Sequence, residues 1–314
     1  MSDFVFCLCA PGAEATLKKE VQDRGLAWSP SYQRPGFVTF KREDKLLPEL
    51  TWARARSVSL GRWTAPFTLD NFIYPGTPDL LRVSARDEAD QVMAQQLAQT
   101  LGASLKKPQL GQNIAEVVVV GPEEVWVGGH THDSTHAIYP GGVGPPLTPQ
   151  APSRAHAKLE AVLAWWGEMP QKDEWALELG SAPGGASWVL LNQGLWVTGV
   201  DPGAMDEKIL RHPHYRHISA SINILTRADF AQRVDWLLAD MNVTPQLTLK
   251  SARRVIEAAW PKPRALVLTL KLKSWSLATQ LPDWCALVRE WGYSEVRAKQ
   301  LWPHRQELVL VAKK

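Results

Sequence analysis

Cysteine is scarce in this sequence: the 314 residues include three, Cys7, Cys9 and Cys285. An odd and sparse set argues against a disulfide framework. Cys7 and Cys9 are two residues apart in an apolar run, so we expect both on the same face of a strand, as packing residues. Since neither has a CxxC partner, the sequence also argues against a cysteine-based zinc site.

Long apolar runs are missing as well. No stretch of about 18 uncharged apolar residues occurs, so we expect no membrane span. The opening residues, MSDFVFCLCAPGAEA, have no basic segment ahead of their short apolar run, which argues against a secretory signal peptide. The expected compartment is therefore the cytoplasm.

A strong net charge is also absent, because the formal charge is only +3. This value alone does not indicate a nucleic-acid-binding protein. Basic residues do gather in two stretches, 18–56 and 253–273. Such clusters suit contacts with phosphates, although a solvated surface explains any one of these residues equally well.

Composition and length indicate an ordinary globular chain of about two domains, with 45% hydrophobic and 21% charged residues. The segment 141–152, GGVGPPLTPQAP, is rich in glycine and proline and predicts a linker. In the first part we expect an α+β arrangement, with strands at 4–9, 36–41, 80–83, 114–120 and 125–128 and helices at 11–24 and 87–100.

Three histidines crowd the end of this first part, in GGHTHDSTHAIYPGG: His130, His132 and His136. Histidines at short spacing can chelate a metal. Since Asp133 is the one carboxylate among them, we expect no metal here, and predict a polar loop or a loop that faces RNA.

The second part alternates strand and helix signals. Expected strands are 175–179, 195–200, 236–239, 265–270, 295–298 and 307–312, and expected helices are 154–167, 184–193, 247–260 and 278–291. Continuous apolar strands that alternate with helices predict a parallel sheet covered on both faces. The last two strands have no helix between them, which predicts an antiparallel pair at the sheet edge.

The clearest motif lies between the first of these strands and its helix, where the chain reads ELGSAPGG from Glu178 to Gly185. A glycine-rich turn at a helix start lets backbone amides approach a ligand. The dinucleotide pattern GxGxxG is not matched, since Ala182 and Pro183 follow Gly180 and Ser181, so the turn suits a nucleoside better. Asp201, about 20 residues on, ends the next strand, where a carboxylate can accept both hydroxyls of a ribose. A tight turn without a ligand is the alternative.

Four charged residues are expected at the same end of the strands as the glycine turn. Asp240 and Lys271 end two strands, Glu307 starts another, and Lys158 lies on the first helix of this part, one turn after Arg154. A lysine that closes an apolar strand is costly to bury unless it is paired. Each residue alone is explained by a salt bridge, but together with the glycine turn they predict a catalytic site.

This set resembles the Lys-Asp-Lys-Glu tetrad of the FtsJ-type ribose 2′-O-methyltransferases. The segments APSRAHAKLEAVL, LTLKLK and AKQLWPHRQELVLVAKK are similar to bacterial members that modify large-subunit rRNA, and FCLCAPGAEATLKKE resembles their opening strand and helix. The resemblance implies a Rossmann-like, S-adenosylmethionine-dependent methyltransferase domain at 153–314, with a mostly parallel seven-stranded sheet and an antiparallel last strand. It also implies an RNA-binding region made of a ferredoxin-like module at 1–65 and a shortened THUMP-like module at 66–140.

The resemblance also implies roles for single residues. Lys271 would be the base that accepts the ribose proton, and Asp240 would also lie beside the methyl donor. Cofactor contacts are expected from Ala155, Gly180, Ser181, Ala182, Pro183, Gly184, Gly185, Asp201, Ser221 and Asp240. Ser221 stands where the family usually has an aspartate that binds the adenine amine, and serine accepts a hydrogen bond more weakly. RNA contacts are expected from Arg154, Arg253, Arg254 and Lys273.

The expected reaction is methyl transfer from S-adenosylmethionine to a ribose hydroxyl, with a cytidine of 23S rRNA, free or in an assembly intermediate, as the leading substrate. A lysine is protonated at neutral pH. We expect burial, Lys158 and the cationic cofactor to lower the pKa of Lys271, against Asp240 and Glu307. Three alternatives stay open: a catalytically silent RNA-binding protein of this fold, a nicotinamide-dependent oxidoreductase, and a methyltransferase for proteins or small molecules.

Overall fold

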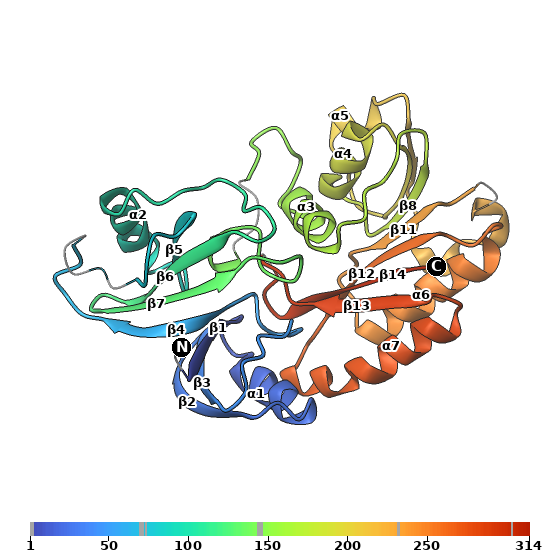
Figure 1. Ribbon diagram of the computed structural model, residues 1–314. Helices are drawn as coiled ribbons and strands as arrows, with labels where there is room; N and C mark the ends of the chain where they lie inside the picture. The colour runs from blue at the N-terminus through green and yellow to red at the C-terminus, as the bar shows by residue number, and fades with distance from the viewer. Residues whose placement is uncertain (1–2, 69–71, 73, 143–146, 231–232, 303) are drawn as a thin grey trace. The chain divides into compact units, whose positions relative to one another are not determined.

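The structure is a computed structural model that describes residues 3–68, 72, 74–142, 147–230, 233–302 and 304–314. The chain divides into two compact units, Met1–Val143 and Gly144–Lys314. Each unit is built on its own seven-stranded sheet (Figure 1). The division falls inside the glycine- and proline-rich segment 141–152.

The first unit is an α+β sheet with the strand order β2-β3-β1-β4-β7-β6-β5. Strands β5 and β6 are parallel and the other neighbours are antiparallel. Its elements are β1 (Phe4–Leu8), α1 (Glu14–Asp23), β2 (Trp28–Arg34), β3 (Phe37–Arg42), β4 (Ala55–Trp63), β5 (Leu80–Ala85), α2 (Gln91–Thr100), β6 (Asn113–Gly121), β7 (Glu124–Thr131) and the short 3-10 turn η2 (Pro140–Gly142). Because β4 pairs with both β1 and β7, the regions 1–65 and 66–140 share one sheet, and their division into two modules stays a prediction.

Two strands of this unit have no counterpart in the expected pattern. β2 is an edge strand whose residues are mostly exposed, so it lacks the apolar run that marks a buried strand. In β4 the pairing with β7 shifts between Ser59 and Gly61, which breaks the alternation of side chains. In both segments, pairing with neighbouring strands fixes the extended conformation, which the local sequence pattern does not indicate.

The histidine segment differs from the loop that the sequence predicts. His130 lies within β7, and His132 and His136 are buried. The rings of His130 and His136 stack with centroids 4.1 Å apart. Burial lowers the pKa of His130 to about 2 and that of His136 to about 4, so both are neutral near pH 7. Within the described part of the chain, no group of three or more His, Cys, Asp or Glu residues is arranged to hold a metal ion.

The second unit confirms the expected α/β fold. Its sheet has the order β10-β9-β8-β11-β12-β14-β13, parallel except for β14, which runs antiparallel to both of its neighbours. Its strands are β8 (Trp175–Leu179), β9 (Trp196–Val200), β10 (Tyr215–Ile218), β11 (Trp236–Ala239), β12 (Ala265–Lys271), β13 (Glu295–Lys299) and β14 (Glu307–Lys313). Its α-helices are α3 (Ala155–Trp166), α4 (Gly185–Asn192), α5 (Glu207–Leu210), α6 (Pro245–Ala258) and α7 (Leu281–Glu290).

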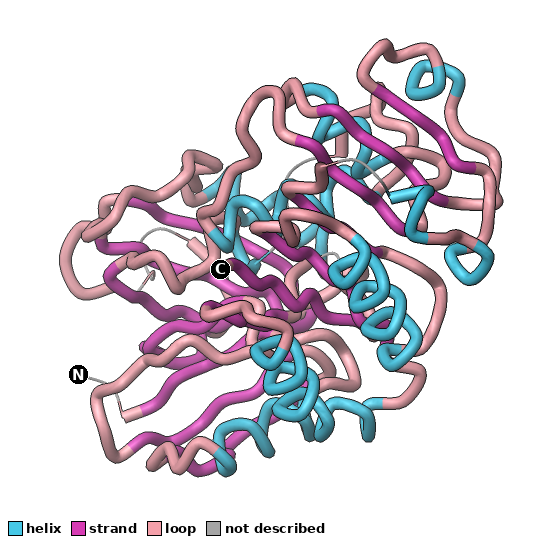
Figure 2. The backbone as a smooth tube through the Cα atoms, turned by 90° about the vertical axis from the view of Figure 1, so that its right-hand side faces the viewer, coloured by secondary structure: helices cyan, strands magenta, loops and turns pink. Residues whose placement is uncertain are grey.

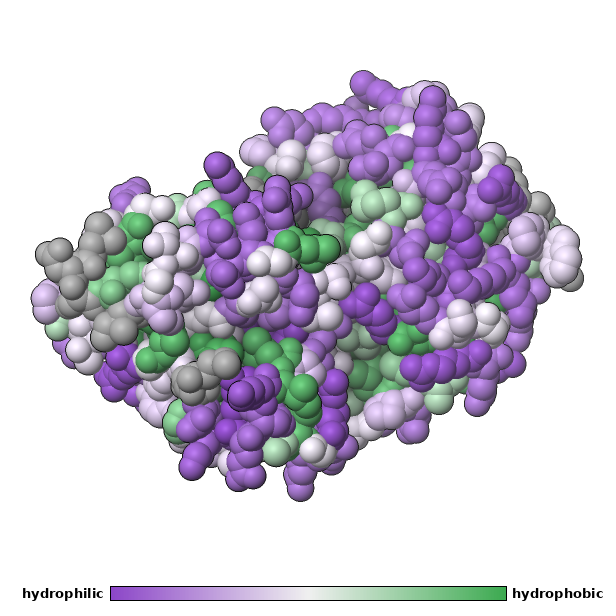
Figure 3. Space-filling model, viewed as in Figure 1, coloured by the Kyte–Doolittle hydropathy of each residue, from purple (hydrophilic) through white to green (hydrophobic). Residues whose placement is uncertain are grey.

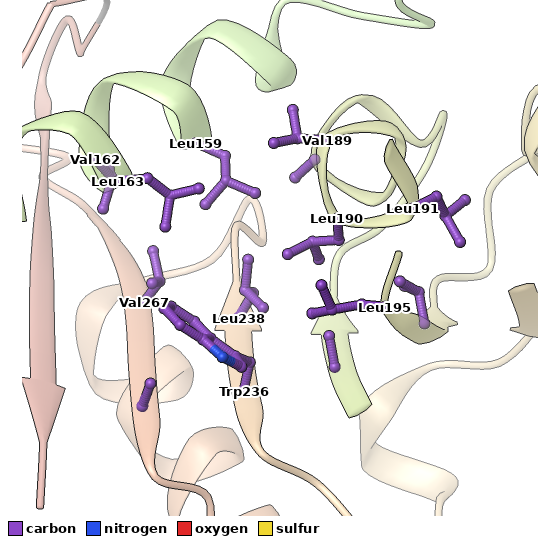
Figure 4. Packing of buried hydrophobic residues seen from close by; sticks show 14 of the residues in the cluster. Leu159, Val162, Leu163, Val189, Leu190, Leu191, Leu195, Trp236, Leu238 and Val267 are labelled. Carbon is purple, nitrogen blue, oxygen red and sulfur yellow. The ribbon is translucent and has the colours of Figure 1, made fainter. Parts of the chain in front are cut away.

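Helices cover both faces of this sheet, with α3 and α4 on one side and α6 and α7 on the other (Figure 1). In the tube of Figure 2 the helices, in cyan, likewise flank the magenta strands. Figure 4 shows Leu159 and Leu163 of α3 and Leu190 of α4 meeting the strand residues Leu238 and Val267, and all five belong to one buried cluster. Alternate residues of the strands are buried on the opposite face, as continuous apolar strands require.

The surface shown in Figure 3 is mainly hydrophilic, with hydrophobic residues in smaller patches. Among the described residues, none of the helices is both long and apolar enough to cross a lipid bilayer.

The connection from β10 to β11 is unusual for a parallel sheet. The described parts of this crossover contain two 3-10 turns, η3 (Ile222–Ile224) and η4 (Arg227–Phe230), where an α-helix is the common connection. The sequence pattern shows neither this arrangement nor β10, because YRHI is polar and its residues are half-buried or exposed.

Candidate active site

The carboxyl ends of the parallel strands bring three of the four predicted charged residues together. Asp240 directly follows β11, and Lys271 ends β12, the neighbouring strand. Because β14 runs antiparallel to β12, its first residue, Glu307, pairs in register with Lys271. Lys158 comes from the first turn of α3, which lies over the same sheet (Figure 1). The fold therefore gathers residues that are up to 149 positions apart in the sequence, from 158 to 307.

The four side chains form a closed ring of alternating charge. The Lys158 Nζ lies 3.3 Å from the Asp240 Oδ2 and 2.5 Å from the Glu307 Oε1. The Lys271 Nζ lies 3.1 Å from the Asp240 Oδ1 and 3.4 Å from the Glu307 Oε2. Each carboxylate thus bridges both ammonium groups. The side chains are 11–26% exposed, so the ring is partly desolvated while a ligand can still reach it.

The ring sets the charge state of its members. Burial alone would raise the pKa of Asp240, but Lys158 and Lys271 hold it below its ordinary value. Burial lowers the pKa of Lys271, but attraction to Asp240 and Glu307 outweighs burial and raises it above its ordinary value. The expectation that the pKa of Lys271 falls is therefore wrong for the protein without ligands, because two carboxylates at 3.1 Å and 3.4 Å stabilise the ammonium form.

The turn after β8 lies next to this ring. Gly180 has φ +81°, and a Cβ there would lie 2.6 Å from the carbonyl oxygen of Asp240. Only glycine adopts this positive φ readily and has no Cβ to collide with the Asp240 carbonyl group. The turn therefore lies closer to the ring than any other residue at position 180 would permit. At Gly185, a Cβ would lie 2.9 Å from the carbonyl oxygen of Ser153, which places the start of α4 against the start of α3.

Asp201 joins the turn after β8 to the turn after β9. Its Oδ1 accepts a hydrogen bond from the Gly203 amide at 2.7 Å, and its Oδ2 accepts one from the Ala182 amide at 3.2 Å. These bonds fix the carboxylate, and each oxygen keeps a lone pair for a further donor. The Asp201 carboxylate can therefore accept hydrogen bonds from two neighbouring hydroxyl groups, one at each oxygen.

The remaining predicted contacts are dispersed. Ser221 is exposed, three residues after the end of β10, and its Oγ accepts a hydrogen bond from the Asn223 amide. Arg154 and Lys273 are exposed and lie one helical turn from Lys158 and two residues from Lys271. Arg253 is exposed and pairs with Glu257 on the same helix at 2.7 Å. Arg254, also expected to contact RNA, donates hydrogen bonds to backbone carbonyl groups of the same unit.

A cavity of about 30 Å³ lies beside the ring, under α3 and α4. Its polar lining includes three residues that the sequence reasoning did not assign to the site: Glu178, Thr269 and His304. Burial raises the pKa of Glu178 to about 8, and the Ser187 hydroxyl bonds to its Oε2 at 2.5 Å. The available signal was a carboxyl group inside an apolar strand, one residue before its end and two before the glycine of the turn. The volume suffices for a water molecule.

Comparison with known proteins agrees with this geometry. Residues 151–281 match the family model described as FtsJ-like methyltransferase. The chain carries an FtsJ-like methyltransferase domain. That FtsJ-like domain lies within the second unit and contains Lys158, Asp240 and Lys271, the glycine turn and Asp201, whereas Glu307 lies beyond the matched residues.

Curated relatives of the FtsJ-like protein extend the likeness to the first unit. A protein named ribosomal RNA large subunit methyltransferase M from Xanthomonas axonopodis is 27% identical over 98% of this chain and 98% of its own length. A protein of the same name from Saccharophagus degradans is 26% identical over 88% of this chain and 89% of its own. A third, from Xylella fastidiosa, is 31% identical over 53% of this chain and 48% of its own.

Proposed function

We propose that this chain is an S-adenosylmethionine-dependent ribose 2′-O-methyltransferase of large-subunit rRNA, with a cytidine of 23S rRNA as its target. The observation that carries the proposal is the closed ring of Lys158, Asp240, Lys271 and Glu307 beside the glycine turn. The likeness over most of the chain to proteins named ribosomal RNA large subunit methyltransferase M supports the choice of RNA.

The residues at the sheet edge fit a nucleoside cofactor. The Asp201 carboxylate is fixed by two amides and would accept hydrogen bonds from the ribose hydroxyls. Ser221, past the end of the neighbouring strand, would accept one from the adenine amine. The rest of the cofactor site would be lined by the Ala155 backbone and by the turn residues Ser181, Ala182, Pro183, Gly184 and Gly185. When bound, the cofactor would supply an electrophilic methyl group on a positively charged sulfur.

The ring would act on the nucleophile. A ribose hydroxyl is a weak nucleophile at neutral pH, so its proton must leave toward a base as the new bond forms. Lys271 is the proposed base, because it closes β12 at the sheet edge and is partly exposed. Asp240 and Glu307 would orient its amine, and Lys158 balances their charge. Arg154 and Lys273, exposed near the ring, would contact the phosphates that flank the target.

The proposal is tested by mapping ribose methylation across the rRNA of a strain in which this gene is deleted. We expect one 2′-O-methyl group to disappear from large-subunit rRNA and to return with the wild-type gene. Lys271→Ala should fail to restore it, because loss of a general base costs about 10²–10⁴-fold in rate. Purified Lys271→Ala should still bind S-adenosylhomocysteine, measured by isothermal titration calorimetry.

The control is Lys172→Ala, an exposed lysine that packs beside Gly194 and precedes β8, whereas the glycine turn follows the end of that strand. It should restore methylation fully. If the deletion strain keeps every ribose methyl group and the pure protein does not bind S-adenosylhomocysteine, the chain is a silent RNA-binding protein and the proposal is wrong. Robust turnover by Lys271→Ala would remove Lys271 from the mechanism.

A further inference from the structure

Residues 219–225, which follow β10, are exposed or half-buried except for Leu225, which is buried. η3 (Ile222–Ile224) has no buried residue, and the side chain of Ile224 is 71% exposed. A segment with few buried apolar contacts opens easily unless polar bonds hold it. Ser221 caps this turn through its hydroxyl, so the position of Ser221 depends on that of the turn.

Arg254, on helix α6, binds the backbone of this segment with its guanidinium group. Its Nη1 donates a hydrogen bond to the carbonyl oxygen of Ile222 at 3.1 Å, and its Nη2 donates one to that of Leu225 at 2.8 Å. The two carbonyls lie at the beginning of η3 and just after its end. A guanidinium group presents two donors in a rigid plane, which a lysine does not. Arg254 therefore fixes both ends of the turn that Ser221 caps.

The held segment leaves the sheet next to the carboxylate of the proposed nucleoside site. The Asp201 amide donates to the carbonyl oxygen of Ile218 at 3.2 Å, and the Ala220 amide donates to the same oxygen at 2.9 Å. The His217 Nε2 lies 3.0 Å from the Asp201 carbonyl oxygen. The carboxyl ends of β9 and β10 are thus tied together. Ligands of parallel sheets bind outside this edge.

We infer that Arg254 is a positioning residue for cofactor recognition, which holds the turn at 222–225 so that Ser221 faces the base of the cofactor. The inference rests on the proposed function, because it assumes a cofactor with an adenine base. It replaces the expected RNA contact of Arg254 with a role inside the FtsJ-like domain, because both terminal nitrogens of its guanidinium bond to backbone carbonyls.

The adjacent arginine provides a matched control. Arg253 lies on the same helix and carries the same charge, but its side chain is 56% exposed and pairs with Glu257. Loss of a positive charge from α6 is therefore equal in Arg253→Ala and Arg254→Ala. Only the second variant removes the bonds to the turn.

The experiment measures binding of S-adenosylhomocysteine and of its analogue in which a hydrogen replaces the amine of the base, because the serine hydroxyl could still donate a hydrogen bond to an oxygen at that position. Titration calorimetry is done on full-length wild type, Arg253→Ala, Arg254→Ala and Arg254→Lys. We expect wild type and Arg253→Ala to prefer the adenine ligand. Both Arg254 variants should lose about tenfold in affinity for it, the value of one hydrogen bond, with little change for the analogue that lacks the amine. In turnover assays KM for the cofactor should rise while kcat is nearly unchanged.

The alternative outcomes separate the two proposals. Equal weakening of both ligands by Arg254→Ala would indicate a general structural role and overturn the inference, as would unchanged binding. A defect confined to KM for RNA, rescued by Arg254→Lys and reduced at high salt, would assign Arg254 to a phosphate contact and also overturn it. Arg254→Lys keeps the charge and most of the side chain, so it serves if Arg254→Ala does not fold. If wild type binds neither ligand, the proposed function itself fails.

Discussion

At the residue scale, the charge state of Lys271 decides how the site can work. The two carboxylates of the ring hold its ammonium form, so the free protein carries a protonated base whose pKa lies above the ordinary value of 10.5. Because the pKa of Lys271 is raised, its neutral form is rare near pH 7. That form becomes more common as the pH increases. The ring thus keeps the amine in place while leaving it inactive until its proton is lost.

This charge state predicts the pH dependence of the reaction. For wild type, kcat/KM for the cofactor reports groups of the free enzyme, so it should rise by about tenfold per pH unit from pH 7 to pH 9, as the neutral fraction of Lys271 grows. The measurement is the initial rate of methyl transfer at subsaturating cofactor, with stability checked at each pH. A flat profile over this range would contradict the assignment of Lys271 as the base. The residual activity of Lys271→Ala should lack the rise.

At the element scale, the sheet of the FtsJ-like domain is largely readable from the sequence, and the site only partly. β8, β11 and β12 are mainly apolar, nearly fully buried strands, and the positions of Asp240 and Lys271 follow from the places where β11 and β12 end. β10 and the 3-10 crossover were missed, because their residues are polar or exposed and tertiary contacts decide their conformation. The direction of the Lys271 pKa shift depends on distances to Asp240 and Glu307, which no sequence pattern supplies.

The turn after β8 gives a prediction at this scale. Gly180 and Gly167 both have positive φ, +81° and +80°, but a Cβ at Gly180 would collide with the Asp240 carbonyl, whereas at Gly167 nothing lies within 4 Å. Gly167→Ala should cost about 1–2 kcal/mol, the backbone term alone. Gly180→Ala should cost more and should also abolish binding of S-adenosylhomocysteine, because Asp240 must shift. Urea unfolding and titration calorimetry test both. Equal costs and intact binding in the two variants would show that the close approach is unimportant.

At the scale of the whole molecule, each unit has its own sheet and its own buried clusters. In the FtsJ-like domain, residues of α3 and α4 pack on β8, β11 and β12, whereas in the first unit α2 packs on β6 and β7. The boundary between the two units, at 143/144, lies within a segment of high glycine and proline content. Units with separate cores can unfold separately, and the free energy of unfolding is then not a single quantity.

This separation predicts how a cofactor product changes thermal unfolding. Every residue proposed to contact the cofactor lies in Gly144–Lys314, so S-adenosylhomocysteine should stabilise that unit alone. At 100 times Kd the gain is about 2.7 kcal/mol. Differential scanning calorimetry of the full chain should therefore resolve two transitions, of which one moves upward with ligand concentration while the other stays fixed. Lys271→Ala should behave like wild type here, because its cofactor contacts are intact. A single transition that shifts as a whole would mean that the two cores unfold together, and that ligand binding in the FtsJ-like domain also stabilises the first unit.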